Sequence, residues 1–432
     1  MPQLGVSAVA VYALVVSSAA QYRLQPPPPI SPKLIKAGRI LDVASGKYVL
    51  NQGILTDQDK IREVGPWEQV RSHAPSVAII DLSQATVLPG LIDCHSHMLV
   101  SMPAHISGGE ALTTAVSLMS PEFRTLLGAM HARDYLEAGV TAVRVVGHSG
   151  VQGDIALRDA IKAGFVSGPR IQAAGRKLTP PGGQATYLQP ALAKQILEEE
   201  YIIVSGPDEA RKAVRENLAI GADIIKLALD SGAGPFWKFR YLAPDEVKAA
   251  TDDAHRLHMR VAAHAVEQDA IQTAIDAGVD SIEHAFLASD AELAQMRDKG
   301  IFLVATDIPE NGGSPESKDR LQRAMKLGLT KIAIGSDLWF PPATGRNYGE
   351  AALDDLKALR EEGMANVDII RAATVNGAEL LGWSDKIGQI APGKFADLIA
   401  LSADPLQDVT SLQHVRFVMK GSIVIKNEYT VN

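Results

Sequence analysis

The sequence predicts an α/β fold, a (β/α)8 TIM barrel to which both ends of the chain add a small β-sandwich domain. The first observation is a unit that recurs in the middle of the chain, in which a helical pattern ends at glycine and an apolar strand follows at once. The second is that short strands broken by turns fill both ends of the chain. Since the chain has 432 residues, it is long enough for a large barrel with an accessory piece.

The recurring unit indicates parallel strands that alternate with helices. Glycine is favoured after each helix because the backbone there takes a positive φ before it turns back into a strand. Strands that are buried on both faces of a parallel sheet are continuously apolar, as Ile301–Val304 and Ile332–Ile334 are. The glycines that end the units are Gly139, Gly221, Gly278, Gly300 and Gly328.

Eight strands are expected in this region. An eight-strand series favours a barrel over an open doubly wound sheet. The alternative, a Rossmann fold, lacks its G-x-G-x-x-G motif at the start of a helix after the first strand. The expected strands are Leu91–His97, Thr141–Gly147, Arg170–Ala174, Asp223–Leu229, Arg260–Ala265, Asp280–His284, Ile301–Thr306 and Lys331–Ser336.

Both ends of the chain contain strand candidates, such as Ile40–Val43 and Asp397–Leu401. Neither end is long enough to bury a core alone, so we expect the two ends to pair into one β-sandwich. The predicted organisation is a signal peptide with a Pro-rich linker at 1–33, sandwich strands at 34–88, the barrel at 89–384 and further sandwich strands at 385–432.

Composition excludes several classes of function. There are 42 Lys and Arg against 50 Asp and Glu, a net charge of −8, and no basic cluster, so nucleic acid is not an expected partner. With 46% apolar and 21% charged residues, the chain has the composition of an ordinary globular protein. Cys94 is the only cysteine, which excludes an intrachain disulfide.

The N-terminal stretch Leu4–Ala20 is apolar and uncharged, and it is followed by the proline run Pro26–Pro29. It fits the apolar region of a signal peptide with a small-residue cleavage site, although no Lys or Arg precedes Arg23. A signal peptide predicts a periplasmic or secreted protein; a frayed extension or a mis-assigned start predicts a cytoplasmic one. No other apolar run approaches the ~20 residues of a membrane span, so no integral membrane segment is expected.

Polar residues at the ends of the expected strands are the candidates for chemistry, because TIM barrels place their reactive groups there. The first strand ends in Asp93-Cys94-His95-Ser96-His97, and alternation along a strand directs His95 and His97 to one face. A single strand histidine is more often a hydrogen-bonded core residue than a ligand, and a lone lysine is usually a surface cation. The convergence of several such residues at strand ends favours a metal site, and the others are Lys226, His264, His284 and Asp337.

These residues resemble the amidohydrolase superfamily. The resemblance rests on Pro89–His97, on the strand residues Lys226, His264 and His284, and on Gly335-Ser336-Asp337. It extends from about Lys36 to Lys426 and includes Gly388-Gln389-Ile390 and Pro392–Leu398 near the end of the chain. The sequence is most similar to the imidazolonepropionase-like and prolidase-like subgroup, which includes Xaa-Pro and Xaa-Arg dipeptidases and ochratoxinase.

The resemblance implies two Zn²⁺ or other divalent ions per chain. His95, His97 and Asp337 would hold one metal, and His264 and His284 the second, consistent with the imidazole and carboxylate ligands that Zn²⁺ accepts. Lys226 would react with CO₂ to give N6-carboxylysine, which bridges the metals together with a hydroxide. This reaction requires a lowered lysine pKa, which desolvation provides. Mononuclear deaminases of the superfamily lack this lysine, so its presence favours a binuclear hydrolase.

The implied activity is amide hydrolysis by the bridging hydroxide. Asp337 would be a catalytic residue as well as a ligand, taking the hydroxide proton and delivering it to the leaving nitrogen. The expected partner is a small-molecule amide or peptide, namely a dipeptide, an Xaa-Pro peptide, an N-acyl amino acid or an ochratoxin-like amide, and a homo-oligomer is expected. Alternatives are a lactonase or carboxylesterase, an imidazolonepropionase-type cyclic amide hydrolase, and a non-catalytic structural relative.

Substrate contacts are expected from the loops after the strands. His148 follows the second strand, where the subgroup often places a substrate-contacting histidine; the alternative is a surface loop residue. Tyr241 and Arg240 follow the fourth strand, where they could hold a carboxylate or simply pack in a loop. Two positions depart from the subgroup: Val145 follows Arg144 where Asp is common, and Gly182-Gly183-Gln184 stands where Gly-Gly-His is frequent. No role is assigned to His73, His105, His131, His255, His258 and His414.

Overall fold

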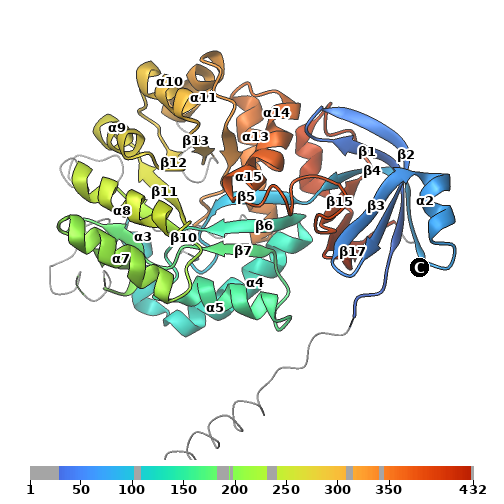
Figure 1. Ribbon diagram of the computed structural model, residues 1–432, viewed down its shortest axis with the longest axis horizontal. Helices are drawn as coiled ribbons and strands as arrows, with labels where there is room; N and C mark the ends of the chain where they lie inside the picture. Colours follow the sequence, from blue (N-terminus) through green and yellow to red (C-terminus); the bar gives the residue numbers. More distant parts are fainter. Residues whose placement is uncertain are drawn as a thin grey trace, which may run out of the picture.

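The computed structural model describes residues 29–101, 109–181, 194, 198–230, 241–307, 315–339 and 345–429, and the side chains of 109–113 are not described. The expected signal peptide, Arg240 and the segment Gly182–Gln184 lie outside these residues. In the described part, strands form three sheets, and helices cover the parallel ones (Figure 1). None of the helices in these ranges is long and apolar enough to cross a membrane.

Each of the eight expected strands is present; one has the expected bounds, and the others differ by one or two residues at an end. Two short strands that the sequence did not indicate, β8 (Lys177–Thr179) and β9 (Tyr201–Ile203), lie between the third and fourth. The eight are β5 (Leu91–Ser96), β6 (Val140–Val145), β7 (Arg170–Ala173), β10 (Ile224–Ala228), β11 (Arg260–Ala265), β12 (Ser281–His284), β13 (Phe302–Ala305) and β14 (Ile332–Ile334).

These strands form two parallel sheets, which confirms the predicted α/β class. One sheet has the order β5-β6-β7, and the other has the order β14-β13-β12-β11-β10-β8-β9. Backbone hydrogen bonds join the two sheets at both sides. The amide of Asp337 donates to the carbonyl of His95 at 2.8 Å, and the amide of Asp223 donates to the carbonyl of Ala173 at 2.8 Å. The eight strands therefore follow one another in space in their chain order.

Helices alternate with the parallel strands and lie outside them (Figure 1). All five glycines that the sequence placed after helices have a positive φ, between 69° at Gly300 and 98° at Gly139. The helices are α3 (Gly109–Leu118), α4 (Pro121–Glu137), α5 (Gly153–Lys162), α7 (Pro207–Ala219), α8 (Pro244–Arg256), α9 (Gln268–Ala277), α10 (Asp290–Lys299), α11 (Pro315–Lys326), α12 (Tyr348–Ala352), α13 (Asp354–Glu361), α14 (Asn366–Ala372) and α15 (Val375–Leu380).

Both ends of the chain contribute to the third sheet, as predicted. Its order is β17-β16-β15-β4-β1-β2-β3, and β4 pairs with β15 in antiparallel register, with Leu88 opposite Ile399. Helix α2 (Trp67–His73) packs against it. The strands are β1 (Leu34–Asp42), β2 (Lys47–Asp57), β3 (Lys60–Pro66), β4 (Ile79–Pro89), β15 (Leu398–Leu401), β16 (Phe417–Lys420) and β17 (Ile423–Asn427), with the 3₁₀ helix η3 (Val409–His414) between β15 and β16.

The described strands at the two ends of the chain form one continuous sheet, whereas the sequence predicted a sandwich. The sheet curls, because a bridge between Lys60 and Phe395 brings the edge strand β3 to the segment before β15. Apolar side chains from both ends of the chain, including Ile54 and Phe417, form a buried cluster of their own. The two-sheet sandwich stays a prediction.

The curled sheet leads directly into the first parallel strand. β4 ends at Pro89 and β5 begins at Leu91, with Gly90 between them. A Cβ atom on Gly90 would lie 2.1 Å from Oγ1 of Thr141, so only glycine allows the chain to pass this close to β6. This close passage fixes where β5 starts and therefore where the histidines at its far end lie.

Candidate metal centre

Four of the predicted ligands meet at the carboxyl ends of the parallel strands. His95 and His97 come from the end of β5, His284 from the end of β12, and Asp337 follows β14. Oδ1 of Asp337 lies 3.1 Å from Nε2 of His97 and 3.4 Å from Nε2 of His95. Ligand atoms of His95, His284 and Asp337 all lie within 4.8 Å of one another, so these three residues could hold a metal ion.

The fifth ligand expected by resemblance, His264, extends this cluster on one side. It lies near the end of β11, and its ring centroid is 4.6 Å from that of His284. The structure therefore brings all four predicted histidines and Asp337 to one place.

Each of the four histidines has one ring nitrogen next to an oxygen atom of the protein. Such contacts fix the tautomer of a metal-binding imidazole and orient its other nitrogen toward the ion. The other nitrogen of each ring is thus the one that would bind a metal ion. The contacts are His95 Nδ1 to Glu283 Oε2 at 2.7 Å, His97 Nδ1 to Gly147 O at 3.0 Å, His284 Nδ1 to Thr306 Oγ1 at 2.7 Å and His264 Nε2 to Asp230 Oδ1 at 3.1 Å.

Burial favours the neutral form that metals bind in three of these imidazoles, those of His97, His264 and His284. Desolvation lowers the pKa of His97 to about 3, although its hydrogen bond with Asp337 acts in the opposite direction. Desolvation also places the pKa of His284 well below its usual value and lowers that of His264. The site is therefore ready to accept cations without first releasing protons from these rings.

Lys226 lies in the middle of β10, where every residue is buried. Its Nζ has no hydrogen-bond partner in the described part of the chain. Burial lowers the pKa of Lys226 to about 8, while the negative charges of Glu283 and Asp337 act against this shift. A buried polar atom without a partner is unfavourable and calls for a ligand or a chemical change.

Two neighbouring residues support Asp337, one at its carboxylate and one at the strand end that carries it. Nε1 of Trp339 donates to its Oδ1 at 2.6 Å, and the Trp339 ring lies 4.2 Å from the ring of His97. Asp93 receives hydrogen bonds from the amide and the hydroxyl of the neighbouring Ser336, at 3.1 and 2.6 Å. Asp93 thereby fixes the strand end that carries Asp337. The sequence analysis gave no role to Trp339.

A buried ion pair beneath the cluster was missed by the sequence analysis. Nη2 of Arg144 lies 2.8 and 3.0 Å from the two carboxylate oxygens of Glu283, which also holds His95. Burial alone would raise the pKa of Glu283, but Arg144, Lys226 and His95 outweigh it and hold that pKa far below its usual range. The signal was present: each is a charged residue inside an apolar strand, the same feature that singled out Lys226.

His148, which follows β6, is buried and is not a surface loop residue. Its ring lies 4.9 Å from that of His97, and its Nε2 contacts Nζ of Lys177. The chain turns inward here because Gly147 and His148 both have a positive φ, at 110° and 59°. A Cβ atom on Gly147 would lie 2.7 Å from Lys177, so this glycine admits the lysine. Lys177, on the unexpected strand β8, was also missed.

Strained backbone is concentrated at the cluster. His148, His284 and Asp337 have φ values of +59°, +71° and +44°, which residues other than glycine rarely adopt. Such conformations cost about 1–3 kcal/mol each and persist where the surrounding structure imposes them. At Asp337 the imposing contact is its amide hydrogen bond to the carbonyl of His95. This strain aims the side chains of all three residues into one place.

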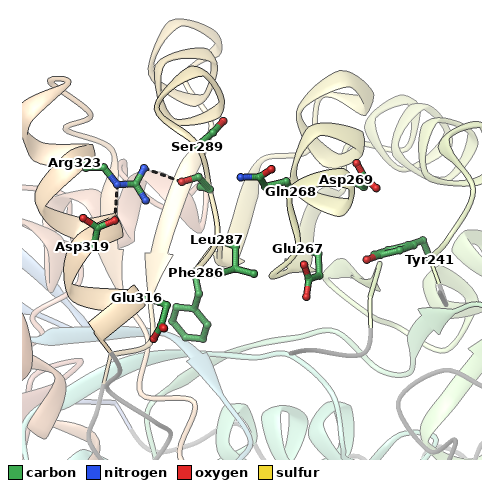
Figure 2. A pocket seen from close by; sticks show the side chains of 11 residues that line it. Tyr241, Glu267, Gln268, Asp269, Phe286, Leu287, Ser289, Glu316, Asp319 and Arg323 are labelled. Atoms are coloured by element: carbon green, nitrogen blue, oxygen red, sulfur yellow. Dashed lines mark hydrogen bonds and ion pairs between the residues drawn. The ribbon is translucent and has the colours of Figure 1, made fainter. Parts of the chain in front are cut away.

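Figure 2 shows a cavity of about 770 Å³ whose lining includes residues that follow β11 and β12. Phe286 lines it, and its ring centroid lies 5.5 Å from that of His284. Tyr241, expected to contact substrate, lines the cavity too, and Figure 2 shows its hydroxyl directed toward Glu267. Burial and the negative charge of Glu267 raise the pKa of Tyr241. Arg240, its predicted companion, lies outside the described residues.

Comparisons with known proteins agree with this site. Residues 86–425 match the model of the amidohydrolase family. Ochratoxinase of Aspergillus niger is 30% identical over 383 residues, which is 79% of this chain and 75% of that protein. Imidazolonepropionase of Bdellovibrio bacteriovorus is 24% identical over 398 residues, 85% of this chain and 87% of that protein.

Solved structures give the same result. A Xaa-Pro dipeptidase with bound methionine in its active site is 30% identical, with a TM-score of 0.78, over 92% of this chain and 100% of that chain. The crystal structure of A. niger ochratoxinase is 25% identical, with a TM-score of 0.78, over 92% of this chain and 96% of that chain.

The chain belongs to the amidohydrolase family. It is accordingly an enzyme, a hydrolase that acts on amide or related carbon–nitrogen bonds. The family is generally metal-dependent, and His95, His284 and Asp337 are placed so that they could hold a metal ion.

Proposed function

We propose that the protein is a binuclear metal-dependent amidohydrolase that cleaves a dipeptide, an Xaa-Pro peptide, an N-acyl amino acid or an ochratoxin-like amide. One observation carries this proposal: four histidines and one aspartate converge on the end of the strand that carries the buried Lys226. A mononuclear site would use fewer of these donors and would leave Lys226 without a purpose.

The donors fit two divalent ions such as Zn²⁺. His95, His97 and Asp337 would hold one ion, and His264 and His284 the other. Lys226 would bridge them as N6-carboxylysine, and its buried, partnerless Nζ supports this role. A lysine whose pKa is lowered to about 8 has an appreciable neutral fraction near pH 7, which is the form that reacts with CO₂.

The chemistry of the residues follows from their placement. When bound, the two ions supply a Lewis acid for the scissile carbonyl and acidify the attacking water. Asp337 accepts the proton of that water and transfers it to the leaving nitrogen, because an amine leaves poorly as an anion. Trp339 supports this role, since its hydrogen bond occupies Oδ1 of Asp337 and orients the carboxylate.

Substrate binding is assigned to His148, Tyr241 and Arg240. His148 lies beside His97, and Tyr241 lines the cavity together with Phe286, whose ring contacts that of His284. The names of the relatives favour a substrate with an amino acid at one end. They include a Xaa-Pro dipeptidase with methionine in its active site and a prolidase complexed with N-methylphosphonate-L-proline.

The fold proposed for this function is a closed (β/α)8 barrel at 89–384, flanked by one accessory domain from 34–88 and 385–432. The hydrogen bonds from Asp337 to His95 and from Asp223 to Ala173 support closure on both sides. A homo-oligomer is proposed as well.

The test is a screen of the purified protein against dipeptides, N-acyl amino acids, lactones and esters, with elemental analysis of the same samples. We expect about two divalent ions per chain and amide hydrolysis, both reduced in His264→Ala. His414→Ala is the matched control, because His414 is an exposed histidine outside the cluster. Full activity with one ion per chain would contradict the binuclear site, and turnover of lactones or esters alone would favour the alternative hydrolases.

A further inference from the structure

A buried aspartate outside the ligand cluster joins the ends of two parallel strands. Asp355 lies in the first turn of α13 and is fully buried. Its Oδ2 accepts a hydrogen bond from the amide of Gly335 at 3.2 Å, and its Oδ1 accepts one from the amide of Asp307 at 3.3 Å. Gly335 directly follows β14, and Asp307 lies two residues after β13. One carboxyl group therefore ties the carboxyl ends of both strands to the same helix.

Gly335 connects Asp355 to two of the residues that could hold a metal ion. A Cβ atom on Gly335 would lie 2.5 Å from Cβ of His95, so the glycine backbone packs directly against that histidine. Asp337 follows two residues later, and its amide donates to the carbonyl of His95. The amide of Gly335 is shared between Asp355 and the carbonyl of Ala305, which it reaches at 2.9 Å. Because the packing is this close, a shift of Gly335 would move both His95 and Asp337.

The other strand end supports His284. Thr306 precedes Asp307, and its hydroxyl oxygen lies 2.7 Å from Nδ1 of His284. Such a contact fixes the orientation of a metal-binding imidazole. The side chain of Asp307 is itself anchored by an ion pair with the buried Arg320 of α11. Through its two amide contacts, Asp355 is thus connected to all three residues whose ligand atoms lie together.

An aspartate at this position is unfavourable for the fold by itself. Leu356 and Leu359 on the same helix are buried, and an apolar residue is the usual one at a fully buried position. Burial raises the pKa of Asp355 well above its usual value, and the negative charge of Asp307 acts in the same direction, whereas the amide hydrogen bonds oppose the shift. What an aspartate provides here is a pair of acceptor oxygens for two N–H donors, where an asparagine would provide only one.

We propose that Asp355 is a positioning residue, which holds the ends of β13 and β14 where the metal-binding group needs them. This inference rests on the proposed function, because it assumes that the cluster binds divalent ions. Asp355 acts through the two backbone amides and not as a ligand. Without its acceptors, the strand ends would no longer hold the ligand atoms together, and metal affinity would fall even where the fold survives.

The test measures Zn²⁺ affinity by titration of the metal-free proteins against a competing chelator, together with their unfolding in urea. Loss of a contact that orients a metal ligand lowers affinity by about 10–100-fold. We therefore expect binding to weaken about tenfold in Asp355→Asn, which keeps one acceptor, and further in Asp355→Ala, which keeps none. Asp355→Asn has almost the same size as wild type, and it decides the matter if Asp355→Ala fails to fold.

Two controls separate positioning from a general loss of stability. Asp354→Asn is the matched substitution at the neighbouring residue, whose carboxylate pairs with Arg346 instead. Leu356→Ala leaves a cavity under the same helix and destabilises the metal-free protein without removing an acceptor from either amide. We expect both controls to bind Zn²⁺ as tightly as wild type does, although Leu356→Ala should unfold at a lower urea concentration.

The outcomes distinguish this inference from the proposed function. If Asp355→Asn binds Zn²⁺ as tightly as wild type, or if Leu356→Ala loses as much affinity as Asp355→Asn, the positioning role is overturned and the proposed function stands. If wild type binds a single ion, the binuclear site fails, and the affinity for that ion still decides the role of Asp355. If wild type binds no Zn²⁺, the metal centre and the positioning role fail together.

Discussion

Removal of the carboxylate of Glu283 tests how the cluster is supported from below. Glu283 is fully buried and accepts hydrogen bonds from Arg144, from the hydroxyl of Ser281 at 2.6 Å and from His95 at 2.7 Å. The substitution Glu283→Met keeps a similar volume and removes every one of these contacts. Two separate effects should follow, one on stability and one on metal affinity.

The magnitudes follow from the partners that are left behind. Breaking a buried ion pair by removing one member costs about 3–5 kcal/mol, because the other charge stays buried without compensation. The loss of a hydrogen bond to a metal-binding histidine lowers metal affinity by about 10–100-fold. The double variant Glu283→Met, Arg144→Met removes both charges and should regain most of the stability, since an apolar replacement of a buried pair is often neutral. Its metal affinity should stay low, because His95 still lacks an acceptor.

The assay is urea unfolding of the metal-free proteins, together with competitive metal titration against a chelator. Arg323→Met is a suitable control, because Arg323 pairs with Asp319 and Asp290 near the surface and not with the cluster. The reasoning is refuted if Glu283→Met unfolds at the urea concentration of wild type. It is refuted equally if the double variant is destabilised by the sum of the two single variants.

Three further predictions follow from the site. Because burial lowers the pKa of Lys226 to about 8, the unfolded state binds more protons at this residue than the folded state between pH 8 and about 10.5. The unfolding free energy of the metal-free protein should therefore rise with pH there by on the order of 3 kcal/mol more than that of Lys226→Met, since other buried lysines such as Lys420 contribute equally to both proteins. Asp337→Asn should lower kcat/KM for an amide at least about tenfold more than for a matched activated ester, and equal losses at unchanged metal content would show that Asp337 is a ligand only. Removal of metal by a chelator should lower the Tm, and titration back should restore it with an end point near two ions per chain; an end point at one ion would contradict the binuclear site.

Local patterns in the sequence were sufficient for the strands and for the residues at their ends. His95, Lys226, His284 and Asp337 are each marked by a short apolar run that ends in or contains a polar residue, and the parallel arrangement of the strands places their carboxyl ends on one side. The positive φ of the glycines after helices was predictable for the same reason, since helix termination is a local property. These features need no knowledge of distant partners.

The supporting contacts could not be predicted because they join residues far apart in the chain. Arg144 and Glu283 are 139 positions apart, so no local pattern indicates their pairing. Lys177 lies on a three-residue strand, too short to show the alternation by which strands are recognised. The inward turn at His148 depends on a positive φ at a residue other than glycine, which sequence does not signal.

The cluster combines several features that each disfavour the folded state, and together they indicate what the site binds. Three residues with a positive φ, buried imidazoles with low pKa values and two neighbouring buried lysines all occur at the same ends of the parallel strands. The imidazoles and the carboxylate of Asp337 are donors for cations, whereas the buried amino group of Lys226 has no hydrogen-bond partner in the described part of the chain. Metal ions alone would occupy the donors and add positive charge beside this amino group. The carbamate proposed for Lys226 would instead replace the amino group with a negative charge that faces the ions.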